Sequence, residues 1–197
     1  MGTTDPTELG NYYAWGETST KKKYYCDNYK HFKVDGGIKV LKYNEEDGKE
    51  VLELEDDVAN AYLGVGYRIP TKEDWEELLE DCEWEVVTTT LPEIVDPSQK
   101  KVIARWKVTG PNGNSIVLPT TSGFKADGWG VQPDYDIYYT TANLCPVDLQ
   151  YRKAVALTWP MFAKETLRDN IEELSFKSIF RDYGIVVRPV FDLYSNK

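Results

Sequence analysis

The chain has 197 residues, a formal net charge of −10 at pH 7 and an isoelectric point near 4.7. A chain of this length buries about 70% of its unfolded surface, so a single domain can form a core without disulfides or metals. The negative charge disfavours nucleic acid and anionic membranes as partners, since lysine and arginine make those contacts, and no stretch reaches the roughly 18 apolar residues of a membrane span.

Particular residue types narrow the function further. The 14 tyrosines and 6 tryptophans suit a recognition surface, because these rings offer rigid, half-apolar contact area, although most individual rings are expected in a β-rich core. Cys26, Cys82 and Cys145 form no CxxC pair, which excludes a zinc ribbon and a disulfide framework and favours three buried thiols over one disulfide and a free thiol. The single histidine, His31, leaves little for metal binding or acid–base chemistry.

The first predicted elements are a short strand and a helix. The strand is expected over residues 38–43, directly after a Gly-Gly turn. The helix is expected over residues 53–63, with Asp56 and Asp57 near the positive end of its dipole. Gly64 is the expected stop of this helix.

A second helix is predicted after Pro70. Thr71 is a suitable N-cap, and Asp74 three residues later completes a short-armed capping box. The apolar face of this helix repeats every three or four residues and consists of Trp75, Leu78, Leu79 and Cys82. The opposite face carries a row of acids that is expected to be solvated, with a cation site as the alternative: Glu73, Glu76, Glu77 and Glu80.

From Cys82 onward the pattern indicates strands. Residues 84–87, 104–109 and 115–118 are expected to be extended, and an Asn-Gly turn within residues 110–114 predicts that the last two pair as a hairpin. Further strands are expected over residues 137–141, 154–158 and 184–191. Residues 167–179 are expected to form either a polar, loosely periodic helix or a long loop.

Five motifs in this order are typical of one protein family. They are GNYYAWGET at residues 10–18, LELEDDVA at 52–59, YRIPTKEDWEELL at 67–79, VTGPNGNSIVLP at 108–119 and YGIVVRPV at 183–190. Together they resemble the bacterial major paralogous domain proteins, often secreted lipoproteins of the Bacteroides group. That family is similar to the formylglycine-generating branch of the C-type-lectin-like fold, and the resemblance runs from about residue 5 to residue 191.

The resemblance implies an α+β fold of the C-type-lectin-like kind, with two helices flanking a twisted, mostly antiparallel sheet and chain ends close together. Residues 1–197 are then a single domain. The first residues do not form a signal peptide, and the sequence alone leaves open an intracellular protein or a trimmed chain. An extracellular or cell-surface location is therefore what the resemblance implies.

The chain departs from the family pattern in three places. An upstream strand that pairs with the closing Arg-Pro-Val segment is expected to be missing, and residues 40–43 or a partner chain are expected to take its place. Residues 138–141 read Tyr-Tyr-Thr-Thr where relatives have Tyr-Trp-Ser-Ser. An insertion is expected around residues 161–180, where it would reshape a binding face.

The leading functional hypothesis is a non-catalytic module that binds a glycan or a surface protein through residues 123–183, because such scaffolds vary their display surface without unfolding. Flat rings would stack on the ligand, and amide and guanidinium groups would orient it. The alternative is that about half of these rings fill the core; of Tyr138 and Tyr139, one should face inward and the other outward. The candidate residues are Trp129, Tyr135, Tyr138, Tyr139, Asn143, Gln150, Tyr151, Arg152, Trp159, Arg181 and Tyr183.

Two other classes of function stay open. The first is a structural subunit of a surface assembly, completed by strand addition at an open sheet edge. The second, an enzyme of the formylglycine-generating type, is disfavoured because its copper chemistry needs a thiol pair near the C-terminal end and no cysteine follows Cys145. A serine hydrolase lacks its motif, and nothing raises Asp134 and Asp136 above turn residues as glycosidase acids.

One tripeptide suggests a metal. Gln132-Pro133-Asp134 matches the galactose-type motif of calcium-dependent lectins, but its companion Trp-Asn-Asp is absent and only Asn143 is near. We therefore expect no metal, no cofactor and no nucleic-acid partner, with self-association left open.

Overall fold

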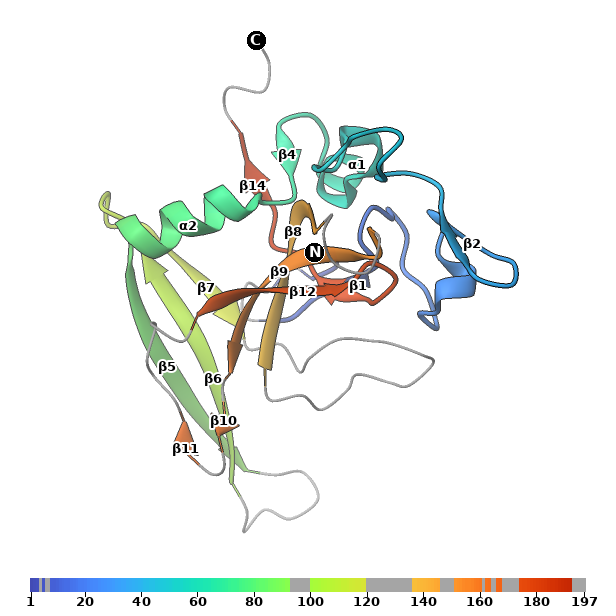
Figure 1. Ribbon diagram of the computed structural model, residues 1–197. Helices are drawn as coiled ribbons and strands as arrows, with labels where there is room; N and C mark the ends of the chain where they lie inside the picture. The colour runs from blue at the N-terminus through green and yellow to red at the C-terminus, as the bar shows by residue number, and fades with distance from the viewer. Residues whose placement is uncertain are drawn as a thin grey trace.

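The computed structural model describes residues 1–3, 5, 8–92, 100–119, 136–145, 151–160, 162–163, 166–167 and 174–192 (Figure 1). Within these residues the fold is a mixed α+β arrangement, mostly of strands, with two α-helices and open sheets whose pairings are antiparallel with one exception. No described helix is both long enough and apolar enough to cross a membrane.

The largest sheet, called here the central sheet, has five strands. In spatial order they are β1 (Tyr12–Tyr13), β13 (Ile185–Val186), β8 (Asp136–Cys145), β9 (Lys153–Pro160) and β12 (Ser175–Phe180). Only β13 and β8 run parallel, with Val186 opposite Tyr139. The first and last segments of the described chain thus lie side by side, and the amino group of Met1 donates to the carbonyl oxygen of Val187 at 3.2 Å.

A second sheet has three antiparallel strands: β5 (Glu83–Pro92), β6 (Lys100–Thr109) and β7 (Ser115–Pro119). The predicted hairpin is confirmed, because β6 and β7 pair across the Asn-Gly turn. The amide of Gly110 donates to the carbonyl oxygen of Asn114 at 2.9 Å, and Gly113 has a φ of 81°, which favours glycine. β5 and β6 pair beyond the end of β7 and extend away from the central sheet (Figure 1).

The other strands of the described residues form three two-stranded sheets. They join β2 (Phe32–Val34) to β3 (Ile38–Val40), β4 (Tyr67–Arg68) to β14 (Val190–Phe191), and β10 (Phe162–Ala163) to β11 (Thr166–Leu167). The strand expected over residues 38–43 therefore ends at Val40, and Tyr43 turns the chain with a φ of 59°. The suggestion that residues 40–43 pair with the closing segment is wrong, because Val190 lies opposite Arg68 instead.

The first helix, α1 (Val58–Leu63), is shorter than expected. Residues Leu54–Asp56 form a separate 3-10 turn, η2, and Asp57 is the N-cap of α1 rather than an interior residue. The carboxylate of Asp57 accepts from the amides of Ala59 at 2.7 Å and of Ile69 at 2.7 Å, so it also ties α1 to β4. The predicted stop at Gly64 is confirmed, with a φ of 88°. A further 3-10 turn, η1, spans Cys26–Asn28.

The second helix, α2 (Lys72–Asp81), begins as predicted. The hydroxyl of Thr71 accepts from the amide of Asp74 at 3.3 Å, and the Asp74 carboxylate accepts from the amide of Thr71 at 2.6 Å. Both halves of the capping box are thus made, which satisfies two amides that would otherwise lack partners.

Residues 175–180 form strand β12, so neither a helix nor a loop is correct for that part of residues 167–179. Strand β12 pairs with β9 from Ser175 opposite Thr158 to Phe180 opposite Lys153. Phe176 packs against one core cluster, whereas Ile179 is buried with Tyr138 and Ala156 in another, as expected for side chains on opposite faces of a strand.

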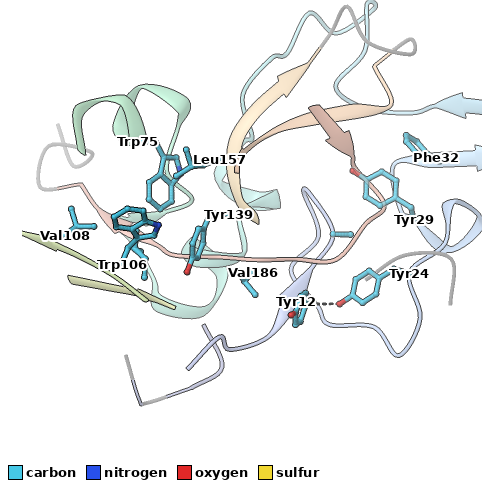
Figure 2. Close-up of a cluster of buried hydrophobic side chains, with 12 residues drawn as sticks. Tyr12, Tyr24, Tyr29, Phe32, Trp75, Trp106, Val108, Tyr139, Leu157 and Val186 are labelled. Atoms are coloured by element: carbon cyan, nitrogen blue, oxygen red, sulfur yellow. Dashed lines mark hydrogen bonds between the residues drawn. The ribbon is translucent and has the colours of Figure 1, made fainter. Parts of the chain in front are cut away.

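The largest core cluster joins both sheets to α2 (Figure 2). Trp75 of α2 stacks on Tyr139 of β8 with ring centroids 5.6 Å apart, and Trp106 of β6 and Leu157 of β9 pack beside them. Trp75 and Trp106 are 1% and 2% exposed, so both indoles are removed from water. Burial of this kind is the main stabilising contribution to the fold.

The central sheet is covered on both faces. Tyr139 lies in the cluster with Trp75, and its hydroxyl donates to the carbonyl oxygen of Pro119, whereas Tyr138 packs on the opposite face with Ala156 and Ile179. Both tyrosines are buried, at 2% and 8% exposure. The expectation that one of them faces outward is wrong. The two side chains point to opposite faces of the sheet, but each face is covered by a core cluster, so both are buried.

Candidate functional site

Several of the sequence-predicted site residues cannot be placed. Trp129, Tyr135 and Gln150 lie outside the described residues, as does the tripeptide Gln132-Pro133-Asp134. Trp159 lies on β9, but only its backbone is described.

Other predicted site residues lie in the protein interior. Tyr138, Tyr139 and Arg181 are buried, so their side chains are not presented at the surface of the described structure. The side chain of Asn143 is half-buried, and its oxygen accepts from the amide of Lys72 at 2.7 Å. Asn143 therefore caps the start of α2.

Two of the remaining predicted residues, Arg152 and Tyr183, are brought together where β9 begins and β12 ends, whereas Tyr151 packs against the core cluster that contains Tyr43. Lys153 opens β9 directly after Arg152, and Phe180 closes β12 directly opposite Lys153. A tight turn, in which the amide of Tyr183 donates to the carbonyl oxygen of Phe180 at 3.2 Å, returns the chain toward this point. We call these four half-buried residues, Arg152, Lys153, Phe180 and Tyr183, the cation–aromatic patch.

The patch is organised around one ring. The Cζ atom of Arg152 lies 5.5 Å from the ring centroid of Phe180, and the Nζ atom of Lys153 lies 5.2 Å from the same centroid. The ring of Tyr183 lies 5.2 Å from that of Phe180 at an interplanar angle of 53°. Two cations and two rings thus share one small surface, in a protein with a formal net charge of −10.

Arg152 differs from the other charged residues of this region because no described residue neutralises its charge. Among the described residues no carboxylate lies within ion-pair distance of its guanidinium, and its buried Nε atom has no hydrogen-bond partner. A guanidinium offers five N–H donors in a planar fork that fits a carboxylate with two parallel hydrogen bonds. The side chain of Arg152 therefore has unused capacity to bind an anion.

Arg181 lies beneath the patch and holds its backbone. The guanidinium donates to the carbonyl oxygens of Tyr151 at 2.9 Å, Tyr43 at 3.3 Å and Lys42 at 3.0 Å, and its Nε donates to the hydroxyl of Tyr29 at 3.2 Å. Tyr43 and Tyr151 are the two described non-glycine residues with positive φ, at 59° and 66°. Because a left-handed turn is unfavourable for a bulky residue, the bonds from Arg181 to both carbonyls help to keep these turns in place.

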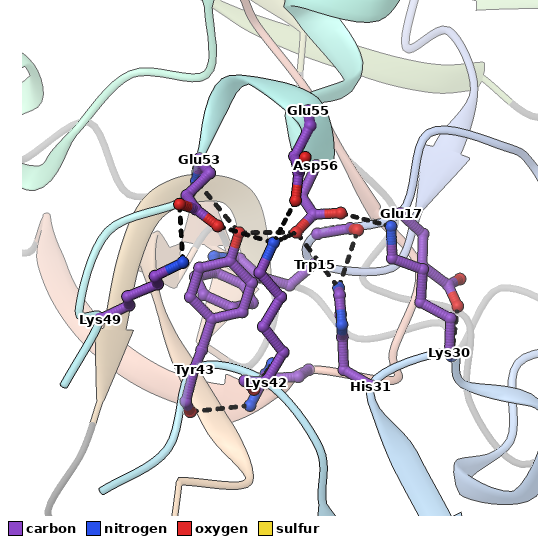
Figure 3. Close-up of polar contacts among 12 residues, drawn as sticks. Trp15, Glu17, Lys30, His31, Lys42, Tyr43, Lys49, Glu53, Glu55 and Asp56 are labelled. Carbon is purple, nitrogen blue, oxygen red and sulfur yellow. Dashed lines mark hydrogen bonds and ion pairs between the residues drawn. The ribbon is translucent and has the colours of Figure 1, made fainter. Parts of the chain in front are cut away.

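A network of charged residues around Asp56 lies next to Tyr43 and Lys42 (Figure 3). Asp56 is 4% exposed and accepts hydrogen bonds from the ammonium groups of Lys30 and Lys42 and from the hydroxyl of Tyr43. Burial alone would raise the pKa of Asp56, but these hydrogen bonds outweigh it and hold the pKa well below its usual range. Asp56 is therefore ionised and fully engaged at neutral pH.

The acids around Lys42 resemble a metal site. One carboxylate oxygen each from Glu53, Glu55 and Asp56 lies within 4.8 Å of the others. The ammonium of Lys42 lies among them, at 2.7 Å from Glu53, 2.6 Å from Glu55 and 2.7 Å from Asp56, as Figure 3 shows. Burial lowers the pKa of Lys42, but the hydrogen bonds to the three carboxylates have the larger combined effect. The pKa of Lys42 therefore lies above its ordinary value. A side chain of the protein thus supplies the cation that the three carboxylates coordinate.

The imidazole of His31 is buried and hydrogen-bonded to the backbone, which disfavours acid–base chemistry by this side chain. Its Nε2 atom lies 3.1 Å from the carbonyl oxygen of Gly16, so this nitrogen carries the proton and donates it. Burial lowers the pKa of His31 to about 4, against weaker opposing effects of the Gly16 bond and of Asp56. The imidazole is neutral at pH 7, and its protonated nitrogen is occupied by a backbone acceptor.

Sequence reasoning missed two members of the patch, Phe180 and Lys153. Phe180 follows a segment that was expected to be a helix or a loop, and there its ring has no predictable direction. The alternation of Phe176, Ser178 and Phe180 is the signal that could have found it, because these three residues share one face of a strand. Lys153 could then have been found as the residue at the start of the neighbouring strand.

Comparisons with protein-family models, with curated proteins and with solved structures gave no match to this chain.

Proposed function

We propose that the protein is a non-catalytic ligand-binding domain of the extracellular or cell-surface type, and that the cation–aromatic patch is part of its binding surface. The observation that carries the proposal is Arg152, whose guanidinium lies 5.5 Å from the ring centroid of Phe180 without a carboxylate partner among the described residues. A half-buried charge of this kind is costly unless a ligand completes its hydrogen bonds.

The state of the other polar groups supports binding rather than catalysis. Asp56, whose pKa is held well below its usual range, and Lys42, whose pKa is raised, bind each other at 2.7 Å. The imidazole of His31 donates to a backbone carbonyl. Catalytic acids and bases need a proton-transfer partner within reach of substrate, and these three side chains are instead engaged within the protein.

The proposal includes a C-type-lectin-like fold related to the bacterial major paralogous domain proteins. Two features support it: two short helices beside antiparallel strands, and the position of Met1 next to Val187. In such a fold, a rigid sheet carries side chains at its rim that can vary without loss of the core. Arg152, directly before β9, and Phe180, the last residue of β12, occupy such rim positions.

The proposal is tested by screening the full chain for binding to immobilised glycans and extracellular-matrix proteins. A specific signal is expected, and it should be lost in Arg152→Gln and in Phe180→Leu, which remove the charge and the ring respectively. Lys39→Gln is the matched control, because it removes one positive charge from an exposed residue of β3. Retention of every signal in both patch variants would show that ligands bind elsewhere, and absence of any signal would contradict the binding function.

A further inference from the structure

The cation–aromatic patch also indicates the chemistry of the ligand. We propose that it binds an acidic glycan through a single sugar carboxylate. Arg152 would donate hydrogen bonds to the carboxylate, and the rings of Phe180 and Tyr183 would pack against the apolar face of the same sugar. This inference rests on the proposed binding function and narrows it to glycans that contain a uronic acid.

The charge of the ligand follows from Arg152. Its guanidinium lacks an ion-pair partner among the described residues, and Lys153 places a second positive charge at 5.2 Å from the same Phe180 centroid. A carboxylate bound to Arg152 would supply the opposite charge that the described residues do not place beside it. A carboxylate matches the planar fork of the guanidinium, so it is the anion that this geometry favours.

The shape of the ligand follows from the rings. Phe180 and Tyr183 have centroids 5.2 Å apart and planes inclined at 53°, so the two rings pack together within one small area. A peptide bound through its backbone needs an extended groove or a free strand edge. A sugar ring instead presents a rigid face of C–H groups with hydroxyls at its rim, which suits a small surface of this kind.

The overall charge limits how acidic the ligand can be. With a formal net charge of −10, the protein repels polyanions, and this repulsion extends over about 8 Å at physiological salt. The patch is therefore suited to one carboxylate at a time. Densely sulfated chains are expected to bind no more tightly than a glycan that carries a single uronic acid.

The test uses three oligosaccharides that differ at one terminal sugar: glucuronic acid, its methyl ester, and glucose. The full chain is expected to bind the acid at least about tenfold more tightly than the ester or the glucose form, which matches the loss of a charged hydrogen-bonded pair. Arg152→Gln should bind all three equally weakly, and Phe180→Leu should weaken all three. Lys39→Gln should retain the preference of the parent protein. Melting curves establish that each variant is folded.

The outcomes separate the two proposals. Equal binding of acid and glucose forms that is unaffected by Arg152→Gln would overturn the acidic-glycan inference while leaving a binding function in place. Binding of acidic peptides but of no glycan, with the same dependence on Arg152, would also overturn it. Absence of binding to every probe in the broader screen would overturn the binding function itself.

Discussion

The guanidinium of Arg181 donates to the carbonyl oxygen of Tyr151 at 2.9 Å, directly before the two cations of the patch. Tyr151 has a φ of 66°, a conformation that its backbone would not hold without support. Arg181 itself is fully buried, with its Cζ atom 4.7 Å from the ring centroid of Trp15. A residue that is expected from sequence to touch ligand thus acts one layer below, where it holds the residue before Arg152.

Replacing Arg181 by methionine is expected to lower the free energy of unfolding by about 3–5 kcal/mol. The methionine fills much of the volume but leaves three carbonyl oxygens and the Tyr29 hydroxyl without their donor. Urea unfolding followed by fluorescence measures the change. The control is Lys177→Met, an exposed residue of the same strand region, for which a change within about 0.5 kcal/mol is expected. A loss no larger than that of the control would contradict the role given to Arg181.

Replacing Lys42 by methionine is expected to cost about 1–3 kcal/mol of unfolding free energy, because Asp56 would keep its buried charge with one cation fewer. Lys49→Met is the matched control. Its pair with Glu53 is exposed on both sides, so its removal should cost less than about 0.5 kcal/mol. Equal effects of the two substitutions would show that the three-acid arrangement around Lys42 adds nothing beyond a surface ion pair.

The same cluster yields a prediction about metals. In Lys42→Ala, the three carboxylates of Glu53, Glu55 and Asp56 lose the ammonium that lies among them. Calcium at about 5 mM is then expected to raise the melting temperature of the variant but not that of the parent protein, because oxygen ligands of this kind suit Ca²⁺. A calcium response of the parent protein that equals that of the variant would contradict the view that Lys42 occupies the position of a cation.

Stability is expected to fall as the pH falls from 6.5 toward 4. The pKa of His31 is lowered from 6.5 to about 4 in the folded protein, so within this range the unfolded chain binds a proton that the folded protein does not. The stabilisation by neutral His31 is complete above pH 6.5, and about 3 kcal/mol of it is lost by pH 4. Asp56 acts in a separate range, since its pKa is lowered and its contribution is lost only below its ordinary value of 3.8.

The His31 effect is measured by urea unfolding at a series of pH values, with His31→Gln as the comparison. Glutamine can still donate to the carbonyl oxygen of Gly16 but does not titrate, so its stability should change much less between pH 6.5 and pH 4.5. Parallel pH profiles for the two proteins would show that other groups control this range.

Replacing Asn143 by alanine is expected to cost about 1 kcal/mol of unfolding free energy and to leave ligand binding unchanged. Its side-chain oxygen accepts from the amide of Lys72 at 2.7 Å, at the start of α2, and alanine would leave that amide without a partner. Thermal unfolding measures the first effect, and the glycan screen measures the second. Loss of binding without loss of stability would restore Asn143 to the ligand-binding surface.

The parts of the fold that sequence predicts well are those set by neighbours in the chain. Thr71 and Asp74 lie three residues apart, and the Asn-Gly turn lies between strands that pair directly, so local chemistry decides both. The helix predicted over residues 53–63 is too long, because Asp57 is not an interior residue: its carboxylate caps the helix.

The parts that sequence does not predict depend on contacts between distant segments. Tyr138 and Tyr139 are both buried because cover comes from α2 on one face and from Ile185 on the other, and neither is visible in the strand itself. Lys42 meets Asp56 across a separation of 14 residues, and Arg181 meets Tyr29 across 152. Residue type marks such side chains as polar, but only the folded chain shows whether they face a ligand or each other.

The long reach of Arg181 has a consequence for how the protein is made. Tyr29 and Tyr43 receive their hydrogen bonds from a residue that is synthesised 152 and 138 positions later. Strand β1 likewise has no neighbour until Ile185 and Val186 have left the ribosome. The segment around β1 therefore lacks these partners until residues 181–186 have been synthesised, and a chaperone that shields its aromatic side chains during that interval is expected to raise the yield of native protein.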